Sequence, residues 1–222
     1  MNIYVVIPLV AMLAYIPLLA TTVTTRPLLK QHKLFAVFLA TAICWSLSDL
    51  LLRSDFLPQY TLLLGRLVII MFTLMAVQFI AFTTSFFAPG QSRWLPVAYT
   101  TLLAVTVIAA LGYLPEDIVF SGGKHYPVYG KWILILAVPL LTVSFRIGYI
   151  LWRRLKILTN PVQYNQVFSL LVSLFVLIVF SLASLLPWGR EFPVSHLGNI
   201  MVACILSYAT IRHQLVDIRF VL

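Results

Sequence analysis

The chain begins MNIYVVIPLVAMLAYIPLLATTVTT, and these residues, 1–25, include no charged side chain. A helix needs about 20 predominantly apolar residues to cross the hydrocarbon core of a bilayer. The segment is long enough for one crossing. Its start lacks the basic residues of a secretory signal, so we expect a retained first membrane helix rather than a cleaved leader.

Further apolar segments of similar length follow along the chain. Three have no charged residue: Leu67–Ser92, Trp94–Pro115 and Phe192–Ile211. Two carry charges, namely 34–52 and 129–151, and one more lies within 157–189. We therefore predict an all-α integral membrane protein, a bundle of seven transmembrane helices. The expected helices cover residues 2–25, 34–53, 61–87, 94–114, 129–151, 164–187 and 193–213.

The composition agrees with a membrane protein and not with a soluble one. Hydrophobic residues make up 62% of the chain and charged residues 9%, with a mean hydropathy of +1.02. A soluble domain has about 25% charged residues. The net charge of +9 is no sign of nucleic-acid binding, because basic residues of a membrane protein gather on one side of the bilayer.

The distribution of basic residues predicts the orientation. With the N-terminus outside, nine cations fall on the inner side and five on the outer side. Arg146 lies near the inner end of the fifth helix and is expected to snorkel inward. The rule that cytoplasmic loops are rich in Lys and Arg then places the C-terminus inside. The inner set is Arg26, Lys30, Lys33, Arg93, Arg153, Arg154, Lys156, Arg212 and Arg219.

The outer connection 115–128, PEDIVFSGGKHYPV, differs from the other loops. Its apolar residues alternate around Gly122–Gly123, which predicts a β-hairpin. Two interpretations remain open. The hairpin either covers the outer mouth of the bundle as a lid or is an ordinary surface hairpin.

Residues for catalysis or cofactor binding are few. None of the four histidines is expected at mid-membrane depth, so a haem held by two histidines is not expected. The last membrane helix contains no lysine, which excludes a retinal Schiff base. We predict no enzymatic activity, no metal and no cofactor. The histidines are His32, His125, His196 and His213.

One polar cluster, in ICWSLSDLLLR, carries the candidate site. Trp45, Asp49 and Arg53 recur every fourth residue and so share one helix face. Arg66 lies at a comparable outer depth on the third helix. Intramembrane charges are costly and usually pair or line a cavity. Either a polar or anionic ligand binds Arg53 and Arg66 beside Trp45, or Asp49 pairs with one arginine and only ties helices two and three together.

The closing residues 207–222, SYATIRHQLVDIRFVL, suggest a helical exit from the membrane. Ile211, Leu215, Ile218 and Leu222 are spaced by four, three and four, the pattern of a coiled-coil seam. We predict a sensor bundle over 1–210 and a cytoplasmic exit over 211–222 that begins a dimeric coiled coil. A simple amphipathic helix end is the alternative.

These residues also carry a resemblance. The segment from Phe192 to Leu222 resembles the last helix and exit of the N-terminal seven-transmembrane sensor region of bacterial histidine kinases. That exit reads approximately Tyr-Ala-Ile-x-Arg-Tyr/His-x-Leu-Leu-Asp-Ile, preceded by a proline. The chain matches it at Tyr208, Ala209, Arg212, His213, Leu215, Asp217 and Ile218, with Pro193 upstream.

The resemblance implies a sensor module in the bacterial cytoplasmic membrane, a homodimer that relays a ligand or bilayer signal to a kinase or another output. The kinase half is absent, and His213 does not replace the phosphoacceptor because no Glu follows it. We expect the chain to stop where the output begins, as a sensor half or as a stand-alone relative. The alternative class is a small permease or the membrane anchor of an electron-transfer complex.

Overall fold

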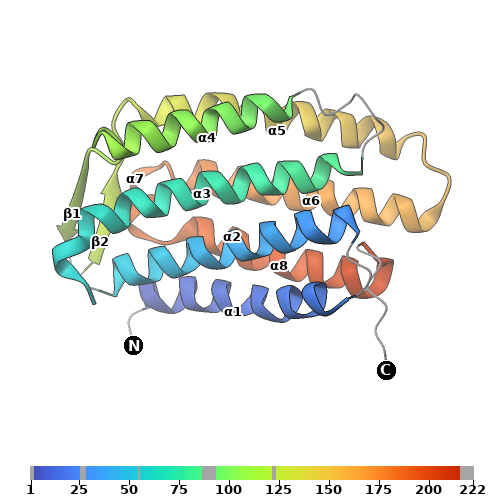
Figure 1. Cartoon of the computed structure of the whole chain (residues 1–222), viewed down its shortest axis with the longest axis horizontal. Coiled ribbons are helices and arrows are strands. Elements are labelled where there is room, and N and C mark those ends of the chain that lie inside the picture. The colour runs from blue at the N-terminus through green and yellow to red at the C-terminus, as the bar shows by residue number, and fades with distance from the viewer. Residues whose placement is uncertain (1–2, 26–28, 55, 87–93, 122–123, 216–222) are drawn as a thin grey trace.

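The computed structural model describes residues 3–25, 29–54, 56–86, 94–121 and 124–215. Within these residues, long helices lie side by side and a β-hairpin covers one end of the bundle (Figure 1). The short elements are the 3-10 helix η1 (Pro58–Tyr60), α7 (Pro187–Glu191), β1 (Asp117–Ser121) and β2 (Lys124–Val128). The long helices are α1 (Ile3–Thr24), α2 (Lys30–Arg53), α3 (Thr61–Thr84), α4 (Leu95–Ala110), α5 (Ile133–Leu155), α6 (Pro161–Ala183) and α8 (Val194–His213).

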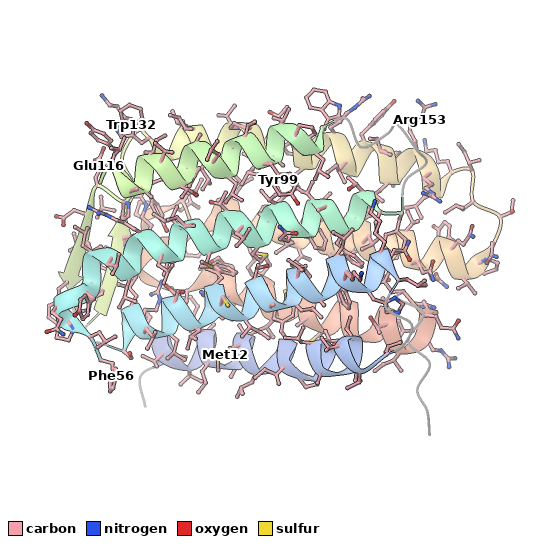
Figure 2. All side chains as sticks on the ribbon, viewed as in Figure 1. Met12, Phe56, Tyr99, Glu116, Trp132 and Arg153 are labelled. Carbon is pink, nitrogen blue, oxygen red and sulfur yellow. The ribbon has the colours of Figure 1, made fainter. Side chains whose placement is uncertain are left out.

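The long helices form a closed ring. Each packs against the next in chain order, from α1 through α6 to α8, and α8 returns to pack against α1. Successive helices run in opposite directions, so α1 begins at the hairpin end and α8 finishes at the other (Figure 1). Figure 2 shows the same two ends, with Glu116 and Trp132 at the hairpin end and Arg153 at the opposite end.

The outer surface of the ring is apolar, as a bilayer requires. Leu103, Phe145 and Phe175 are more than 60% exposed on their helices. Six of the described helices are long and apolar enough to cross a membrane, and α4 is a shorter apolar helix. Soluble monomers rarely expose apolar patches larger than a few hundred Å². The predicted class, an all-α multi-pass membrane protein, is confirmed at this level.

The predicted hairpin is confirmed, and it sits directly on the helix bundle. β1 pairs with β2 in antiparallel register, from Asp117 opposite Val128 to Ser121 opposite Lys124. The strands contact α2, α3 and α7. Ile118 packs so closely on Gly65 of α3 that a Cβ at Gly65 would overlap its side chain. A larger residue at Gly65 would have to displace the end of the Ile118 side chain.

Several predicted helix boundaries were wrong. The second helix begins at Lys30 rather than at 34, and the fifth ends at Leu155 rather than at 151. The fifth helix was expected over 129–151 but begins at Ile133. β2 continues to Val128, and a turn follows in which Ile133 N–H donates to Gly130 O. The fourth was expected to reach residue 114 but ends at Ala110. Gly112 has a φ of 88°, a left-handed conformation that ends the helix there.

The sixth predicted helix, 164–187, is also displaced in the structure. Asn160 caps the N-terminus of α6, because its side-chain oxygen accepts from Val162 N–H at 2.9 Å. With this cap the helix begins at Pro161, before the predicted start at 164, and it ends at Ala183. The short helix α7, which follows it, was not predicted.

The exit of the last helix differs from the prediction of an unbroken helix past His213. Gln214 adopts a left-handed conformation with φ 50°, and Leu215 N–H donates to Ala209 O at 3.1 Å. Leu215 is only 2% exposed, so it folds back into the core instead of extending a seam into water. Gln166 of α6 donates to the carbonyl oxygens of His213 and Gln214, both at 2.9 Å. The other exit residues, Asp217, Ile218 and Leu222, lie outside the described part of the chain.

The contact between α6 and α8 yields a stability prediction. A Cβ at Gly198 would lie 2.5 Å from Phe180 Cβ, whereas a Cβ at Gly148 would lie 3.6 Å from Leu174. We expect Gly198→Ala to lower the free energy of unfolding by about 1–3 kcal/mol through overpacking. Gly148→Ala, the control, should leave it unchanged or raise it by up to about 1 kcal/mol. Equilibrium unfolding in mixed micelles measures both, and equal values for the two variants would contradict the close α6–α8 contact.

Candidate functional site

A cavity of about 130 Å³ lies inside the ring, near the hairpin end. Its wall is built from α2, α3, α5, α6 and α8, and β2 and α7 contribute at the hairpin end. The wall is mostly apolar, with its charged groups supplied by α2 and α7 and a histidine by α8. The charged and ionisable lining residues are Asp49, Arg53, Tyr129, Arg190 and His196.

An ion pair within α2 supplies the first charges of this site. Arg53 Nε lies 2.7 Å from Asp49 Oδ2, one helical turn away, and both side chains are buried. Arg53 Nη1 also donates to Glu191 O at 3.0 Å, which fixes the guanidinium against the end of α7. A buried charge is costly unless it is paired and hydrogen-bonded, and both conditions hold for Asp49 and Arg53.

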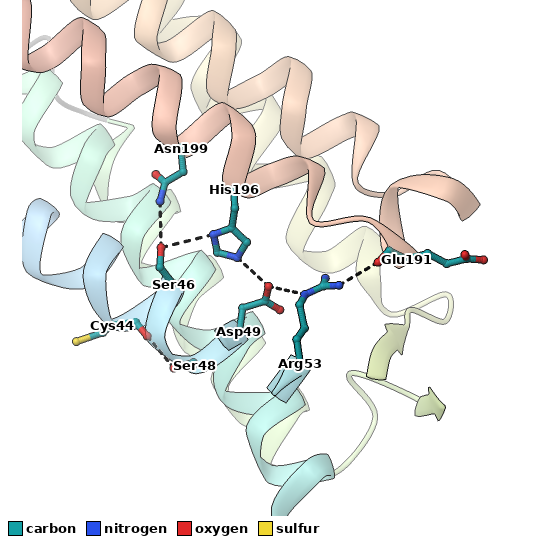
Figure 3. Close-up of polar contacts among 8 residues, drawn as sticks. All are labelled: Cys44, Ser46, Ser48, Asp49, Arg53, Glu191, His196 and Asn199. Atoms are coloured by element: carbon teal, nitrogen blue, oxygen red, sulfur yellow. Dashed lines mark hydrogen bonds and ion pairs between the residues drawn. The ribbon is translucent and has the colours of Figure 1, made fainter. Parts of the chain in front are cut away.

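His196 connects this pair to the last helix. It lies in the first turn of α8, and its Nε2 is 3.0 Å from Asp49 Oδ2. Its ring stacks on Trp45, with centroids 4.1 Å apart and planes 23° apart. Figure 3 shows Asp49 between His196 and Arg53. The three side chains join α2 to α8 at the level where the cavity is most polar.

The polar chain continues deeper into the bundle. Tyr15 O–H donates to Asn199 Oδ1 at 2.7 Å, and Asn199 Nδ2 donates to Ser46 Oγ at 3.3 Å. Ser46 Oγ lies 3.5 Å from His196 Nδ1 (Figure 3). Because Ser46 already accepts from Asn199, its hydroxyl is free to donate to Nδ1. A neutral His196 with its proton on Nε2, donating to Asp49, satisfies every member of the chain.

Ser46, His196 and Asp49 are the residue types of a hydrolytic triad, but their placement does not suit that chemistry. A nucleophile must reach the bound substrate. Ser46 has no exposed surface and does not line the cavity. A molecule in the cavity therefore does not reach its hydroxyl. The chain of bonds holds α1, α2 and α8 together around Asp49.

Arg190 and Tyr129 form the rim of the cavity at the hairpin end. The guanidinium carbon of Arg190 lies 5.5 Å from the centroid of the Tyr129 ring, and Arg190 Nε donates to Leu185 O at 3.1 Å. Burial, together with the nearby Asp49 carboxylate, raises the pKa of Tyr129 to about 12. Tyr129 therefore keeps its proton at neutral pH and can act as a hydrogen-bond donor.

The structure assembles three of the four residues predicted for the site. Trp45, Asp49 and Arg53 line one cavity, as their shared helix face suggested. Arg66 does not line it, since its guanidinium lies against Gly112 at the end of α4, and its Nε has no hydrogen-bond partner. The carboxylate of Asp49 thus contacts α8 rather than pairing with Arg66 on α3.

The site residues that sequence reasoning missed are His196, Arg190 and Tyr129. The sequence did contain a signal for His196. This residue follows Pro193 in the first turn of an apolar helix, which places it at the same depth as Asp49. No comparable signal existed for Arg190 or Tyr129. Both lie in connections, and their positions depend on how α7 and the hairpin pack.

Two of the predicted exit residues face outward. Tyr208 is 60% exposed on α8, and its ring contacts that of His213 edge to face at 5.3 Å. Arg212 is also exposed, one turn further along. Leu215, in contrast, is buried.

Within the described residues, no group of three or more His, Cys, Asp or Glu side chains is placed to hold a metal ion. In comparisons with protein-family models, with curated proteins and with solved structures, the chain matched nothing. The site therefore has to be interpreted from its own geometry.

We predict that removing the Asp49 charge destabilises the bundle more than removing a neighbouring hydroxyl. Asp49→Asn leaves Arg53 buried without its counter-charge and should lower the free energy of unfolding by about 3–5 kcal/mol. Ser48→Ala on the same helix removes only a bond to Cys44 O and serves as the control. The double variant Asp49→Asn/Arg53→Met should lose less than Asp49→Asn alone. Unfolding in mixed micelles measures all three, and a double variant less stable than Asp49→Asn alone would contradict the pairing.

Proposed function

We propose that this protein is a seven-transmembrane sensor of the bacterial cytoplasmic membrane that binds a ligand in the central cavity. It has no catalytic activity of its own in this proposal. Occupancy of the cavity alters the packing of α8, and α8 passes the change to a dimeric cytoplasmic output such as a kinase. The observation that carries the proposal is that His196 of α8 lines the cavity and contacts Asp49 of α2.

The proposed topology places the hairpin outside and the end of α8 in the cytoplasm. Within the described residues, the acids Asp49, Glu116, Asp117 and Glu191 all belong to the hairpin end, on or next to β1, α7 and the end of α2. In the part of the chain that the structure describes, the opposite end carries cations and no acid, as a cytoplasmic surface would. These cations are Lys30, Lys33, Arg153, Arg154, Lys156 and Arg212.

We infer that α4 is the seventh crossing although it has only 16 residues. At 1.5 Å per residue it is about 24 Å long, somewhat less than the hydrocarbon core of about 30 Å. Both α3 and α5 run away from the hairpin end, so the chain has to return between them (Figure 1). α4 packs between these two helices and makes that return. Local thinning of the bilayer accommodates a short span at modest cost.

The mechanism follows from the path of α8. His196 and His213 are 17 positions apart on one helix, a rise of about 26 Å. A ligand that binds one packing of α2 and α8 better than another shifts the population of the bundle toward it. Shifts of a packed helix by about 1–2 Å are a common form of such a switch. The far end of α8 then moves with its first turn.

A topology test uses two exposed positions. In a Cys44→Ala/Cys204→Ala background, Phe120→Cys places a thiol on the hairpin and Ile157→Cys places one beyond α5; these residues are 61% and 75% exposed. A membrane-impermeant maleimide added to intact cells should label the first and not the second. We expect the thiol at position 157 to be labelled only after the cells are lysed. The reverse pattern would overturn the orientation.

A second test measures whether the outer site affects the exit. Single cysteines at positions 207 to 215, in the same background, should crosslink between protomers in native membranes if two copies of α8 meet. His196→Gln removes the histidine between α2 and α8 but keeps the pair of Asp49 and Arg53. We expect it to change the crosslinking yield at least twofold at one or more positions, whereas the control Ser48→Ala leaves the profile unchanged.

The same experiment distinguishes the alternative class. A profile without crosslinking at any position would contradict a dimeric output and favour a small permease or a membrane anchor. A crosslinked profile that His196→Gln leaves unchanged would show that α8 does not carry information from the cavity, and the sensor mechanism would fail.

A further inference from the structure

The rim of the cavity carries an excess of positive charge. Arg53 and Arg190 both line it, and Asp49 is the carboxylate beside them. Asp49 is already engaged, since it accepts from Arg53 Nε and lies within 3.0 Å of His196 Nε2. Among the described residues, Arg190 forms no ion pair, and its one hydrogen bond is to the carbonyl of Leu185. Asp49 offsets one of the two guanidinium charges that line the cavity, and a bound monoanion would offset the other.

The remaining wall is long and apolar. On α3 the lining residues extend from Val68 to Ile80, which corresponds to about 18 Å at 1.5 Å per residue. On α5 they extend from Ile133 to Ser144. A cavity of similar volume, about 150 Å³, holds one benzene molecule when it is compact. The same volume spread along several helical turns is narrow, so it suits a single unbranched chain better than a ring system.

We propose that the ligand is an unbranched medium-chain monocarboxylate, bound with its carboxylate at Arg53 and Arg190. The inference rests on the proposed function, because it names the ligand class of the same cavity. The terminal N–H groups of Arg190 can donate the paired, charge-assisted hydrogen bonds that a carboxylate accepts. The protonated Tyr129 hydroxyl is a further donor at the rim.

The acyl chain lies between α3, α5 and α6 in this arrangement. Its walls are aliphatic and aromatic side chains, with Ser144 at the end furthest from the rim along α5. Burial of each methylene group favours binding by about fourfold in affinity until the chain reaches the end of the cavity. The lining residues of this part include Ile69, Phe72, Met75, Leu136, Leu140 and Leu174.

Binding is measured on the full chain in lipid nanodiscs by titration calorimetry, with empty nanodiscs subtracted to remove partition into lipid. The probes are hexanoate, octanoate and decanoate, with octanol as the uncharged control. We expect affinity to increase along the carboxylate series and octanoate to bind more tightly than octanol. Equal affinity for octanoate and octanol would overturn the proposal.

Two variants test the two halves of the site. Arg190→Gln should weaken octanoate at least tenfold and leave octanol unchanged, whereas Arg66→Gln, at the same end but outside the cavity, should change neither. Ser144→Leu fills the far end and should weaken decanoate more than hexanoate. Unfolding curves verify that each variant is folded. If Arg190→Gln binds octanoate like the wild type, or if Ser144→Leu weakens all chain lengths equally, the assigned pose is wrong.

The outcomes separate this inference from the sensor function. If octanoate binds as expected but leaves the crosslinking profile of α8 unchanged, the ligand class stands and the sensor mechanism fails. If His196→Gln alters that profile while no carboxylate binds, the sensor function stands and the ligand class is wrong.

Discussion

The structure depends on the cost of burying the Asp49 carboxylate within a membrane-type bundle. An ionised carboxylate in an apolar interior requires opposite charge and hydrogen bonds close by. Arg53, one turn along α2, provides the charge at 2.7 Å, and His196 provides a second contact from α8. Each partner is held in turn, Arg53 by Glu191 O and His196 by its stacking on Trp45. The contacts of α7 and α8 with α2 satisfy this one group.

The cavity is a consequence of the same arrangement combined with the ring of helices. Asp49, Arg53 and His196 line one side of the cavity, and side chains of α3, α5 and α6 line the rest. The hairpin then covers this end, with Pro127 and Tyr129 in the wall of the cavity. Of the two interpretations of the hairpin, its contacts with α2, α3 and α7 favour a lid over the mouth of the bundle.

Sequence alone predicted the class of fold, the hairpin and three of the four clustered residues, because these depend on local pattern. Apolar length identifies a membrane helix, and a four-residue spacing places Asp49 and Arg53 on one face. Which side of α3 a residue lies on depends on the order of the helices in the ring, and the sequence does not give that order. Arg66 was therefore assigned to the cluster, although it faces the end of α4. Gln214 was missed because glutamine rarely adopts the left-handed conformation, and only the burial of Leu215 explains it.

The end of α8 is held by groups that act together. For α8 to continue as a helix past His213, Gln214 must leave its left-handed conformation, Gln166 must give up two hydrogen bonds, and Leu215 must leave the core. Exposing a leucine alone costs about 1.5–3 kcal/mol. The turn at Gln214, the two bonds from Gln166 and the burial of Leu215 involve neighbouring residues, so loss of the turn removes all of these contacts. In the proposed sensor, a disturbance of the bundle has to break these contacts together before the end of α8 rearranges.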